Sequence, residues 1–285
     1  MNTFRLALVQ MAVGSDKAAN VARAIQHIST AVVKGNARVV VLPECFNSPY
    51  GSQYFSEYSE AIPGPTTDAL SNAARDNKII LIGGSIPERD GDKLYNTSTV
   101  YSSSGKLLAK YRKIHLFDID VPGGIRFMES ETLSPGKEPL VVESEFGRIG
   151  IGICYDSRFP ELARKYADDG CDFLVYPGAF NMTTGPAHWQ ITARSMSLQN
   201  QLYTVFCSPA RDTSATYIAW GHSLVVDPWG NVIAECDENE EILYADVDLS
   251  RCTEVRQWIP FRNQRRPEIY DSRTEIRRVR ATEVQ

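Results

Sequence analysis

Short, almost wholly apolar segments alternate along this chain with longer amphipathic ones, and this alternation constrains the fold more than any other feature of the sequence. Residues 4–10 form the first apolar run, and a helical pattern that ends at Gly35 follows it. Residues 37–42 and 79–84 repeat the apolar run, with a second helical pattern over 65–78 between them. Strands that are apolar on both faces and are separated by helices predict a sheet covered by helices.

The middle of the chain departs from this rhythm, and the second half returns to it. Residues 94–101 and 107–111 flank a turn-rich segment and predict an antiparallel hairpin, so the sheet is expected to be mixed. Residues 115–137 are rich in proline and glycine, have no clear periodicity and predict a long functional loop. The elements expected after it are strand 148–154, helix 157–169, strand 172–176, helix 188–201 and strands 203–208, 215–226, 232–234 and 242–247.

These elements predict a single α/β domain over residues 1–260, with two sheet layers between helices. No linker rich in proline, serine and glycine divides the two halves, and no repeat of 20–50 residues stands out. From Arg251 onward the composition turns polar, and residues 261–285 form an arginine-rich tail that also carries acidic residues. This mixture of signs favours a solvated or partner-contacting tail over a nucleic-acid arm.

Charge and hydropathy exclude several classes of partner. The 285 residues include 30 Lys and Arg against 35 Asp and Glu, and the resulting net charge of −5 disfavours a nucleic acid as ligand. No stretch approaches the roughly 18 apolar residues that a membrane helix needs, and the N-terminus lacks a basic region followed by a long apolar run. We therefore expect a cytoplasmic protein without nucleic-acid or membrane partners, and leave a mitochondrial fraction open.

The six cysteines are scattered and form neither a zinc-ligand pattern nor a disulfide framework. They are Cys45, Cys154, Cys171, Cys207, Cys236 and Cys252. In a reducing cytosol most of them are expected to be small buried hydrophobic side chains. The sequence thus predicts no bound metal, and Cys154 needs a separate argument.

Three reactive side chains follow directly after apolar strands. Glu44 ends the run that begins at residue 37, Lys113 follows the second strand of the hairpin, and Cys154 follows residues 149–153. Ligands in open α/β sheets bind beyond the carboxyl ends of strands, so these residues are candidates to converge. Each also has a structural explanation: a salt-bridged carboxylate, a solvated lysine and a packed core thiol.

The segments around these residues resemble the three signatures of the nitrilase superfamily of carbon–nitrogen hydrolases. They are Leu42–Glu44, Tyr111–Phe117 and Gly152–Glu161, and the resemblance runs from about Phe4 to Ile259. Four further stretches are similar to the eukaryotic ω-amidase branch of that superfamily, namely 46–51, 117–123, 176–181 and 183–189.

The resemblance implies a four-layer α-β-β-α sandwich, a homodimer and a cofactor-independent amidase. In this interpretation Cys154 is the nucleophile, Glu44 the general base and Lys113 the electrostatic stabiliser of the tetrahedral oxyanion. The backbone N–H of Tyr155 is a second donor to the oxyanion. Glu129 corresponds to a second glutamate that positions the lysine or the substrate amide, and its neighbour Glu131 is the alternative.

The implied substrate is a dicarboxylic acid monoamide such as 2-oxoglutaramate or 2-oxosuccinamate, so the site must hold a carboxylate remote from the amide. Arg158, four residues beyond the cysteine, is the expected carboxylate anchor, with a surface pair to Glu161 as its alternative. Weaker pocket candidates, carried only by their place in the motifs, are Phe180, Thr184, Tyr50 and His115. His222 is expected to be structural.

Three rival functions remain open at this point. A deaminated glutathione amidase would need a roomier pocket, a carbamoyl-amine hydrolase would have little use for Arg158, and a catalytically silent scaffold would need none of Glu44, Lys113 and Cys154. The chain also departs from the family at Gln199, where relatives usually carry an acidic residue. This departure removes a salt bridge expected there and leaves the three reactive residues unaffected.

Overall fold

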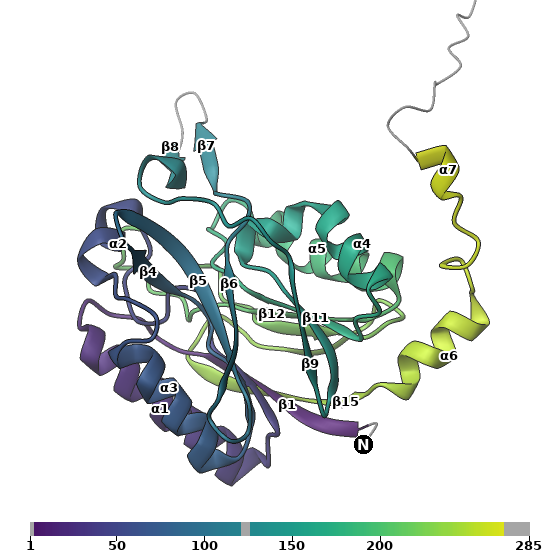
Figure 1. Cartoon of the computed structure of the whole chain (residues 1–285), viewed down its shortest axis with the longest axis horizontal. Helices are drawn as coiled ribbons and strands as arrows, with labels where there is room; N and C mark the ends of the chain where they lie inside the picture. The colour runs from purple at the N-terminus through teal and green to yellow at the C-terminus, as the bar shows by residue number, and fades with distance from the viewer. Residues whose placement is uncertain (1–2, 121–125, 271–285) are drawn as a thin grey trace, which may run out of the picture.

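The computed structural model describes residues 3–120 and 126–270, and two β-sheets lie at its centre (Figure 1). The first sheet has the order β15-β1-β2-β3-β5-β4, with β6 paired to β5; the second has the order β14-β13-β12-β11-β10-β9. The strands of the first sheet are β1 (Thr3–Gln10), β2 (Val39–Val41), β3 (Ile80–Ile82), β4 (Ile86–Asp90), β5 (Lys93–Tyr101), β6 (Leu107–Arg112) and β15 (Glu241–Asp248). Those of the second are β9 (Leu140–Ser144), β10 (Gly147–Ile151), β11 (Phe173–Pro177), β12 (Tyr203–Cys207), β13 (Leu224–Val226) and β14 (Val232–Glu235).

Helices cover the outer face of each sheet. The α-helices are α1 (Lys17–Gly35), α2 (Ser52–Tyr58), α3 (Pro65–Asn77), α4 (Pro160–Asp168), α5 (Gly185–Asn200), α6 (Ser250–Trp258) and α7 (Pro267–Tyr270). Figure 1 shows α1 and α3 on the first sheet and α4 and α5 on the second. The result is the expected four-layer α-β-β-α sandwich.

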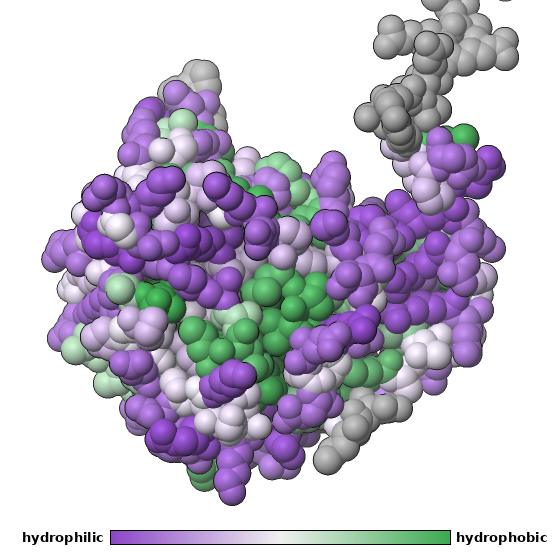
Figure 2. Space-filling view, in the orientation of Figure 1, coloured by the Kyte–Doolittle hydropathy of each residue, from purple (hydrophilic) through white to green (hydrophobic). Residues whose placement is uncertain are grey.

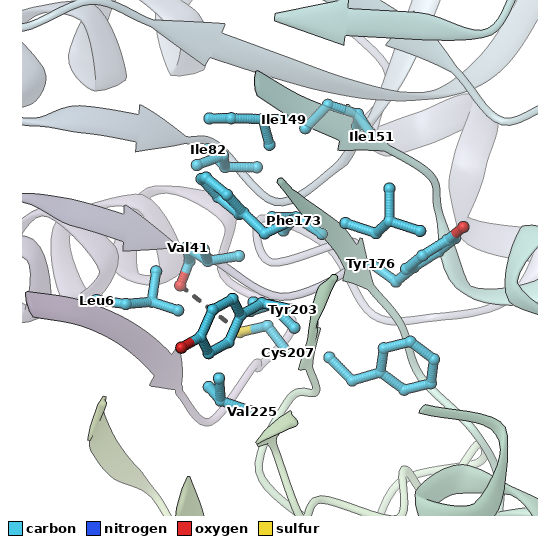
Figure 3. Close-up of a cluster of buried hydrophobic side chains, with 14 of the residues drawn as sticks. Leu6, Val41, Ile82, Ile149, Ile151, Phe173, Tyr176, Tyr203, Cys207 and Val225 are labelled. Carbon is cyan, nitrogen blue, oxygen red and sulfur yellow. Dashed lines mark hydrogen bonds between the residues drawn. The ribbon is translucent and has the colours of Figure 1, made fainter. Parts of the chain in front are cut away.

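The alternation of side chains along β1 explains why this strand is apolar on both faces. Leu6 and Leu8 belong to the core between the two sheets, whereas Ala7 and Val9 pack toward the helices α1 and α3. Successive side chains of a strand point to opposite faces, so both sets are buried. Figure 3 shows the core between the sheets, in which Leu6 from the first sheet lies near side chains of the second. Each such fully buried side chain stabilises the fold by about 1.5–3 kcal/mol.

The central strands of both sheets run parallel. β1, β2 and β3 pair in parallel register, and so do β10, β11 and β12. The loops that follow these strands therefore leave each sheet at the same edge, which is where polar side chains of the two sheets can meet.

The end of α1 differs in detail from the expected glycine stop. Asn36 adopts the left-handed conformation (φ 53°) and caps the helix, while Gly35 is its last helical residue. A Cβ atom on Gly35 would lie 1.9 Å from the ring of Tyr244 on β15. The glycine is thus required by the close approach of helix and strand rather than by a turn.

The hairpin and most expected elements are confirmed, and two expectations are wrong. The predicted loop 115–137 contains two short paired strands, β7 (Asp118–Asp120) and β8 (Arg126–Met128), and the 3-10 helix η1 (Glu129–Glu131). Strands of three residues are too short to show the alternation of apolar and polar residues by which a strand is predicted. Of the predicted strand 215–226, only the last three residues are a strand. The preceding apolar residues instead run beside the loop after β11, where Trp220 N–H donates to the carbonyl of Phe180.

Hydrophobic and hydrophilic side chains are unevenly distributed over the face of the molecule that Figure 2 shows. Figure 2 shows hydrophobic side chains gathered in the middle of this face, where Figure 1 places β6 and β9, and hydrophilic ones around α7. The predicted loop residues 122–124 and the tail beyond residue 270 lie outside the described residues, so the domain boundary at 260 stays a prediction. None of the described helices combines the length and apolar character that crossing a membrane requires.

Candidate active site

Glu44 lies three residues beyond the end of β2, and its carboxylate is completely buried. Its Oε1 accepts a hydrogen bond of 2.9 Å from the side-chain amide of Asn96, and its Oε2 accepts one of 2.8 Å from the backbone N–H of Ala179. Asn96 belongs to β5 of the first sheet, and Ala179 follows β11 of the second. The carboxylate is therefore held from both sheets.

Lys113 follows β6 directly, and its side chain is fully buried between two carboxylates. Its Nζ lies 3.2 Å from Oε1 of Glu44 and 3.0 Å from Oε1 of Glu129. Burial by itself lowers the pKa of Lys113, but the charges of Glu129 and Glu44 outweigh it and raise the pKa well above the usual 10.5. The side chain is thus an ammonium at neutral pH.

Glu129 is the glutamate that reaches Lys113, and Glu131 is not. The buried carboxylate of Glu129 accepts hydrogen bonds from the Tyr50 hydroxyl (2.9 Å) and from the backbone N–H of Phe117 (2.8 Å). Glu131 is exposed and pairs with Arg126. The structure therefore decides between the two alternatives left by the sequence.

Cys154 begins the 3-10 helix η2 (Cys154–Arg158) just beyond β10, in the left-handed backbone conformation (φ 46°). Such a conformation is costly for a residue other than glycine and persists only where its surroundings impose it. Gly152, two residues earlier, allows the backbone to pass close to the ring of Tyr176, because a Cβ at this position would lie 2.2 Å from that ring. The thiol itself is 5% exposed.

The pKa shifts of Glu44 and Cys154 both favour their protonated forms. Burial raises the pKa of the Cys154 thiol well above 9.0, and the charge of Glu44 adds to this, while Lys113 acts in the opposite direction. Burial is also the main reason that the pKa of Glu44 lies above 4.5. The thiol is therefore protonated at rest, and the Glu44 side chain lies within hydrogen-bonding reach of it.

All six cysteines are free and buried, as predicted for small hydrophobic side chains. Across residues 3–120 and 126–270, no group of three or more His, Cys, Asp or Glu side chains is arranged to hold a metal ion.

A cavity of about 60 Å³ adjoins the buried carboxylate of Glu44. Glu44, Tyr50, Ala179 and Tyr217 are among the residues that line it. The Tyr217 hydroxyl donates to the carbonyl of Ala179 (2.6 Å), and its ring lies 4.5 Å from that of Tyr50. No pattern in the sequence singles out Tyr217 or Asn96, because neither stands in a motif or at a strand end.

Arg158 lies beside this cavity rather than in its wall. Its guanidinium is centred 4.6 Å over the ring of Phe180, and its Nη1 lies 3.1 Å from Nδ1 of His188. Phe180 directly follows Ala179, so the arginine stands one residue away from the peptide that holds Glu44. A neighbouring depression of about 420 Å³ is lined by Arg158, His188 and Gln199, among others. The alternative pair with Glu161 does not form among the described residues.

The remaining candidates have mainly structural contacts. The hydroxyl of Thr184 donates to the side chain of Asn181 (3.0 Å) at the start of α5. The ring of Tyr155 packs against Phe117, with 5.2 Å between centroids. Nδ1 of His115 lies 2.7 Å from Oδ1 of Asp156, and His115 is not among the residues that line the cavity, so its place in the pocket stays a prediction.

His222 has structural contacts, as expected. Its carbonyl accepts a hydrogen bond of 2.6 Å from the indole of Trp189, and its ring stacks on that of Trp220. Gln199 is exposed on α5, and its amide donates to the Ser195 hydroxyl (3.0 Å). The Gln199 side chain thus makes an intrahelical contact on the surface of α5.

A four-layer sandwich with a buried Cys, Lys and two Glu beyond the ends of its strands defines a nitrilase-type hydrolase. The chain belongs to the carbon–nitrogen hydrolase family, whose sequence profile matches residues 5–257. It is an enzyme of the class that hydrolyses amides.

Curated relatives and solved structures agree with this assignment. The chain is 56% identical to proteins named omega-amidase NIT2 from Homo sapiens and Danio rerio, over 95% of this chain and 98% and 97% of theirs. The structure of Saccharomyces cerevisiae Nit3, described as a member of branch 10 of the nitrilase superfamily, superposes with a TM-score of 0.86 at 45% identity, covering 93% of this chain and 97% of Nit3.

Proposed function

We propose that this hydrolase is an ω-amidase that converts 2-oxoglutaramate or 2-oxosuccinamate to the 2-oxo acid and ammonia. The observation that carries the proposal is the buried Lys113 ammonium, bound to Glu44 and Glu129 with the Cys154 thiol beside Glu44. The near full-length identity to proteins named omega-amidase supports the choice of substrate class. No cofactor takes part in the proposed reaction.

In the acylation step Cys154 Sγ attacks the amide carbonyl carbon while Glu44 takes the thiol proton. A C–S bond forms, and the carbonyl π electrons move to the oxygen. The Lys113 ammonium and the N–H of Tyr155 stabilise this oxyanion in a site from which water is largely excluded. Collapse of the intermediate breaks the C–N bond, and Glu44 passes its proton to the departing nitrogen, so ammonia leaves a thioester behind.

In the deacylation step Glu44 takes a proton from the incoming water as its oxygen attacks the thioester carbon. The second tetrahedral intermediate again places its negative charge beside Lys113. Its collapse breaks the C–S bond, the thiolate regains the proton from Glu44, and the 2-oxo acid is released. Glu129 acts on both steps as a positioning residue, because it holds the Lys113 ammonium.

The carboxylate end of the substrate is assigned to Arg158. A guanidinium can bind a carboxylate with two parallel hydrogen bonds, and this one is already held over Phe180 near Ala179. Thr184 and Tyr50 are proposed as polar residues of the substrate pocket. A carbamoyl-amine hydrolase would leave Arg158 without a ligand.

Ammonia release from 2-oxoglutaramate tests the proposal. The wild type is expected to release ammonia and Cys154→Ala to be inactive, while Cys236→Ala, which replaces a buried cysteine outside the site, serves as the matched control. Equal inactivity of the wild type and Cys154→Ala would instead support the silent scaffold. Faster turnover of deaminated glutathione than of 2-oxoglutaramate would transfer the assignment to that amidase.

We further propose that two copies associate through α5. Ile191 and Leu198 on this helix are 66% and 52% exposed, and the exposed Trp229 lies next to Gly230, which approaches Leu198. The ring of Trp229 in turn lies 5.8 Å from that of Trp258. An apolar surface of this kind on a water-facing helix favours association.

Light scattering after size-exclusion chromatography tests the homodimer. Leu198→Asp is expected to halve the mass, whereas Val33→Asp, at a position on α1 that is 79% exposed, is expected to leave it unchanged. A wild type with the mass of one chain contradicts the homodimer. The cytoplasmic location stays a prediction, which cell fractionation can test.

A further inference from the structure

Asp156 is a completely buried carboxylate in the turn that carries the nucleophile, and the proposed mechanism does not use it. It lies two residues beyond Cys154, within η2. A charge that is withdrawn from water is costly unless its oxygen atoms are hydrogen-bonded. Its surroundings should therefore show what the carboxylate is for.

Both oxygen atoms of Asp156 accept two hydrogen bonds. Oδ1 accepts the backbone N–H of His115 (2.9 Å) and lies 2.7 Å from Nδ1 of the same residue. Oδ2 accepts the backbone N–H of Ile153 (2.9 Å) and the hydroxyl of Tyr111 (2.7 Å). The four contacts satisfy the carboxylate fully.

These contacts join the two halves of the catalytic apparatus. Ile153 immediately precedes Cys154 and follows β10 of the second sheet, whereas His115 follows Lys113 by two residues and Tyr111 lies on β6 of the first sheet. One carboxylate thus spans the interface between the sheets, at the point where nucleophile and ammonium must be placed relative to each other. Asp156 also accepts the backbone N–H of Ile153, which directly precedes Cys154 in its left-handed conformation.

We propose that Asp156 is a positioning residue that sets the Cys154 turn against the Lys113 segment. The predicted effect on kcat rests on the proposed function, whereas the contacts of Asp156 do not depend on it. Catalysis of this kind depends on distances held to within a fraction of an ångström. Weakening the hydrogen bonds of Asp156 displaces the Cys154 thiol and the Tyr155 N–H relative to the Lys113 ammonium. The chemical steps therefore slow while the fold persists.

The test uses Asp156→Asn, which keeps the shape and places an amide N–H₂ against two donors. The matched control is Asp227→Asn, because Asp227 is also buried and accepts the backbone N–H groups of Trp229 and Asn231, but in the turn between β13 and β14. Two readouts are compared: kcat and KM for 2-oxoglutaramate, and the rate at which iodoacetamide alkylates Cys154, followed by peptide mapping.

The expected result for Asp156→Asn is a fall in kcat of at least tenfold with KM within threefold, and alkylation of Cys154 altered by at least threefold. Asp227→Asn is expected to change neither readout by more than twofold. Equal effects of the two variants, or unchanged readouts in Asp156→Asn, overturn the proposal. If the wild type releases no ammonia, the proposed function is wrong. The positioning role of Asp156 is then still tested by the rate at which Cys154 is alkylated.

Should Asp156→Asn fail to fold, Tyr111→Phe supplies the measurement. This change removes one donor to Asp156 and leaves both peptide contacts in place. A two- to fivefold fall in kcat at unchanged KM supports the positioning role. An unchanged kcat overturns it.

Discussion

The Nζ atom of Lys113 lies 3.2 Å from Oε1 of Glu44, and both side chains are fully withdrawn from solvent. This contact joins β6 and the loop after β2, which are far apart in the sequence but belong to one sheet. A buried ammonium is stable only where carboxylates compensate it. Here two of them, Glu44 and Glu129, do so. In the proposed mechanism the second carboxylate leaves Glu44 free to exchange a proton with the thiol.

Glu129→Gln is predicted to lower kcat at least about 100-fold, equivalent to about 2.7 kcal/mol in the activation barrier. The substitution leaves Glu44 as the one carboxylate bound to Lys113, so the ammonium draws closer to Glu44 and competes with the thiol for it. Steady-state ammonia release measures the effect. A Glu129→Gln enzyme within tenfold of wild type would contradict the positioning role.

Tyr50→Phe serves as the graded control for that prediction. It removes one hydrogen bond to Glu129 and preserves every charge. A hydrogen bond to a charged carboxylate contributes about 1.5–3 kcal/mol, so kcat is expected to fall roughly 10- to 100-fold. A larger loss in Tyr50→Phe than in Glu129→Gln would show that the phenol has a role of its own.

The pH profile should follow the raised pKa of Glu44. Burial favours the neutral acid, so the proton acceptor is lost as the pH falls through a value above the usual 4.5. We therefore predict that kcat/KM rises with pH through a midpoint above 4.5, which belongs to the coupled group as a whole. In Glu129→Gln the residual activity should show a lower midpoint, because the charge of Glu129 also raises the pKa of Glu44. A midpoint at or below 4.5 in the wild type would refute this.

The sequence could predict the layers and the three reactive residues because both depend on local patterns. Leu6 and Ala7 are buried on opposite faces of β1, and an apolar run records that directly. Glu44, Lys113 and Cys154 stand where apolar runs end. Their convergence was a hypothesis, and the structure brings Lys113 to Glu44; their catalytic roles remain predictions until the variants are assayed.

The rest of the site depends on contacts between the sheets, which no local pattern records. Asn96 reaches Glu44 from the middle of β5, and the N–H of Ala179 reaches it from the second sheet. The contacts of His115 are of the same kind. Asp156 of the facing turn accepts its backbone N–H and lies 2.7 Å from its ring Nδ1, which no local pattern of the sequence indicates.

Gly152→Ala is predicted to destabilise the protein by about 1–3 kcal/mol, as overpacking of a tight core does. The added methyl would meet the ring of Tyr176 at 2.2 Å, just before the Cys154 turn. Gly14→Ala is the control, since the nearest atom there is 3.9 Å away. Urea unfolding followed by circular dichroism gives both values. Equal stabilities of the two variants would show that the close approach costs nothing.

Arg158→Ala is predicted to raise KM for 2-oxoglutaramate roughly 10- to 100-fold, because a charge-assisted hydrogen bond contributes about 1.5–3 kcal/mol and 1.4 kcal/mol is tenfold. Propionamide has no carboxylate, so its kcat/KM should stay within threefold of wild type. This second substrate separates loss of the anchor from damage to the neighbouring Phe180 and Ala179. Arg164→Ala, which removes an arginine that pairs with Asp168 on α4, is the matched control and should change neither substrate. If Arg158→Ala leaves KM for 2-oxoglutaramate unchanged, the carboxylate is held elsewhere, and if both substrates suffer equally, the arginine supports the site rather than the substrate.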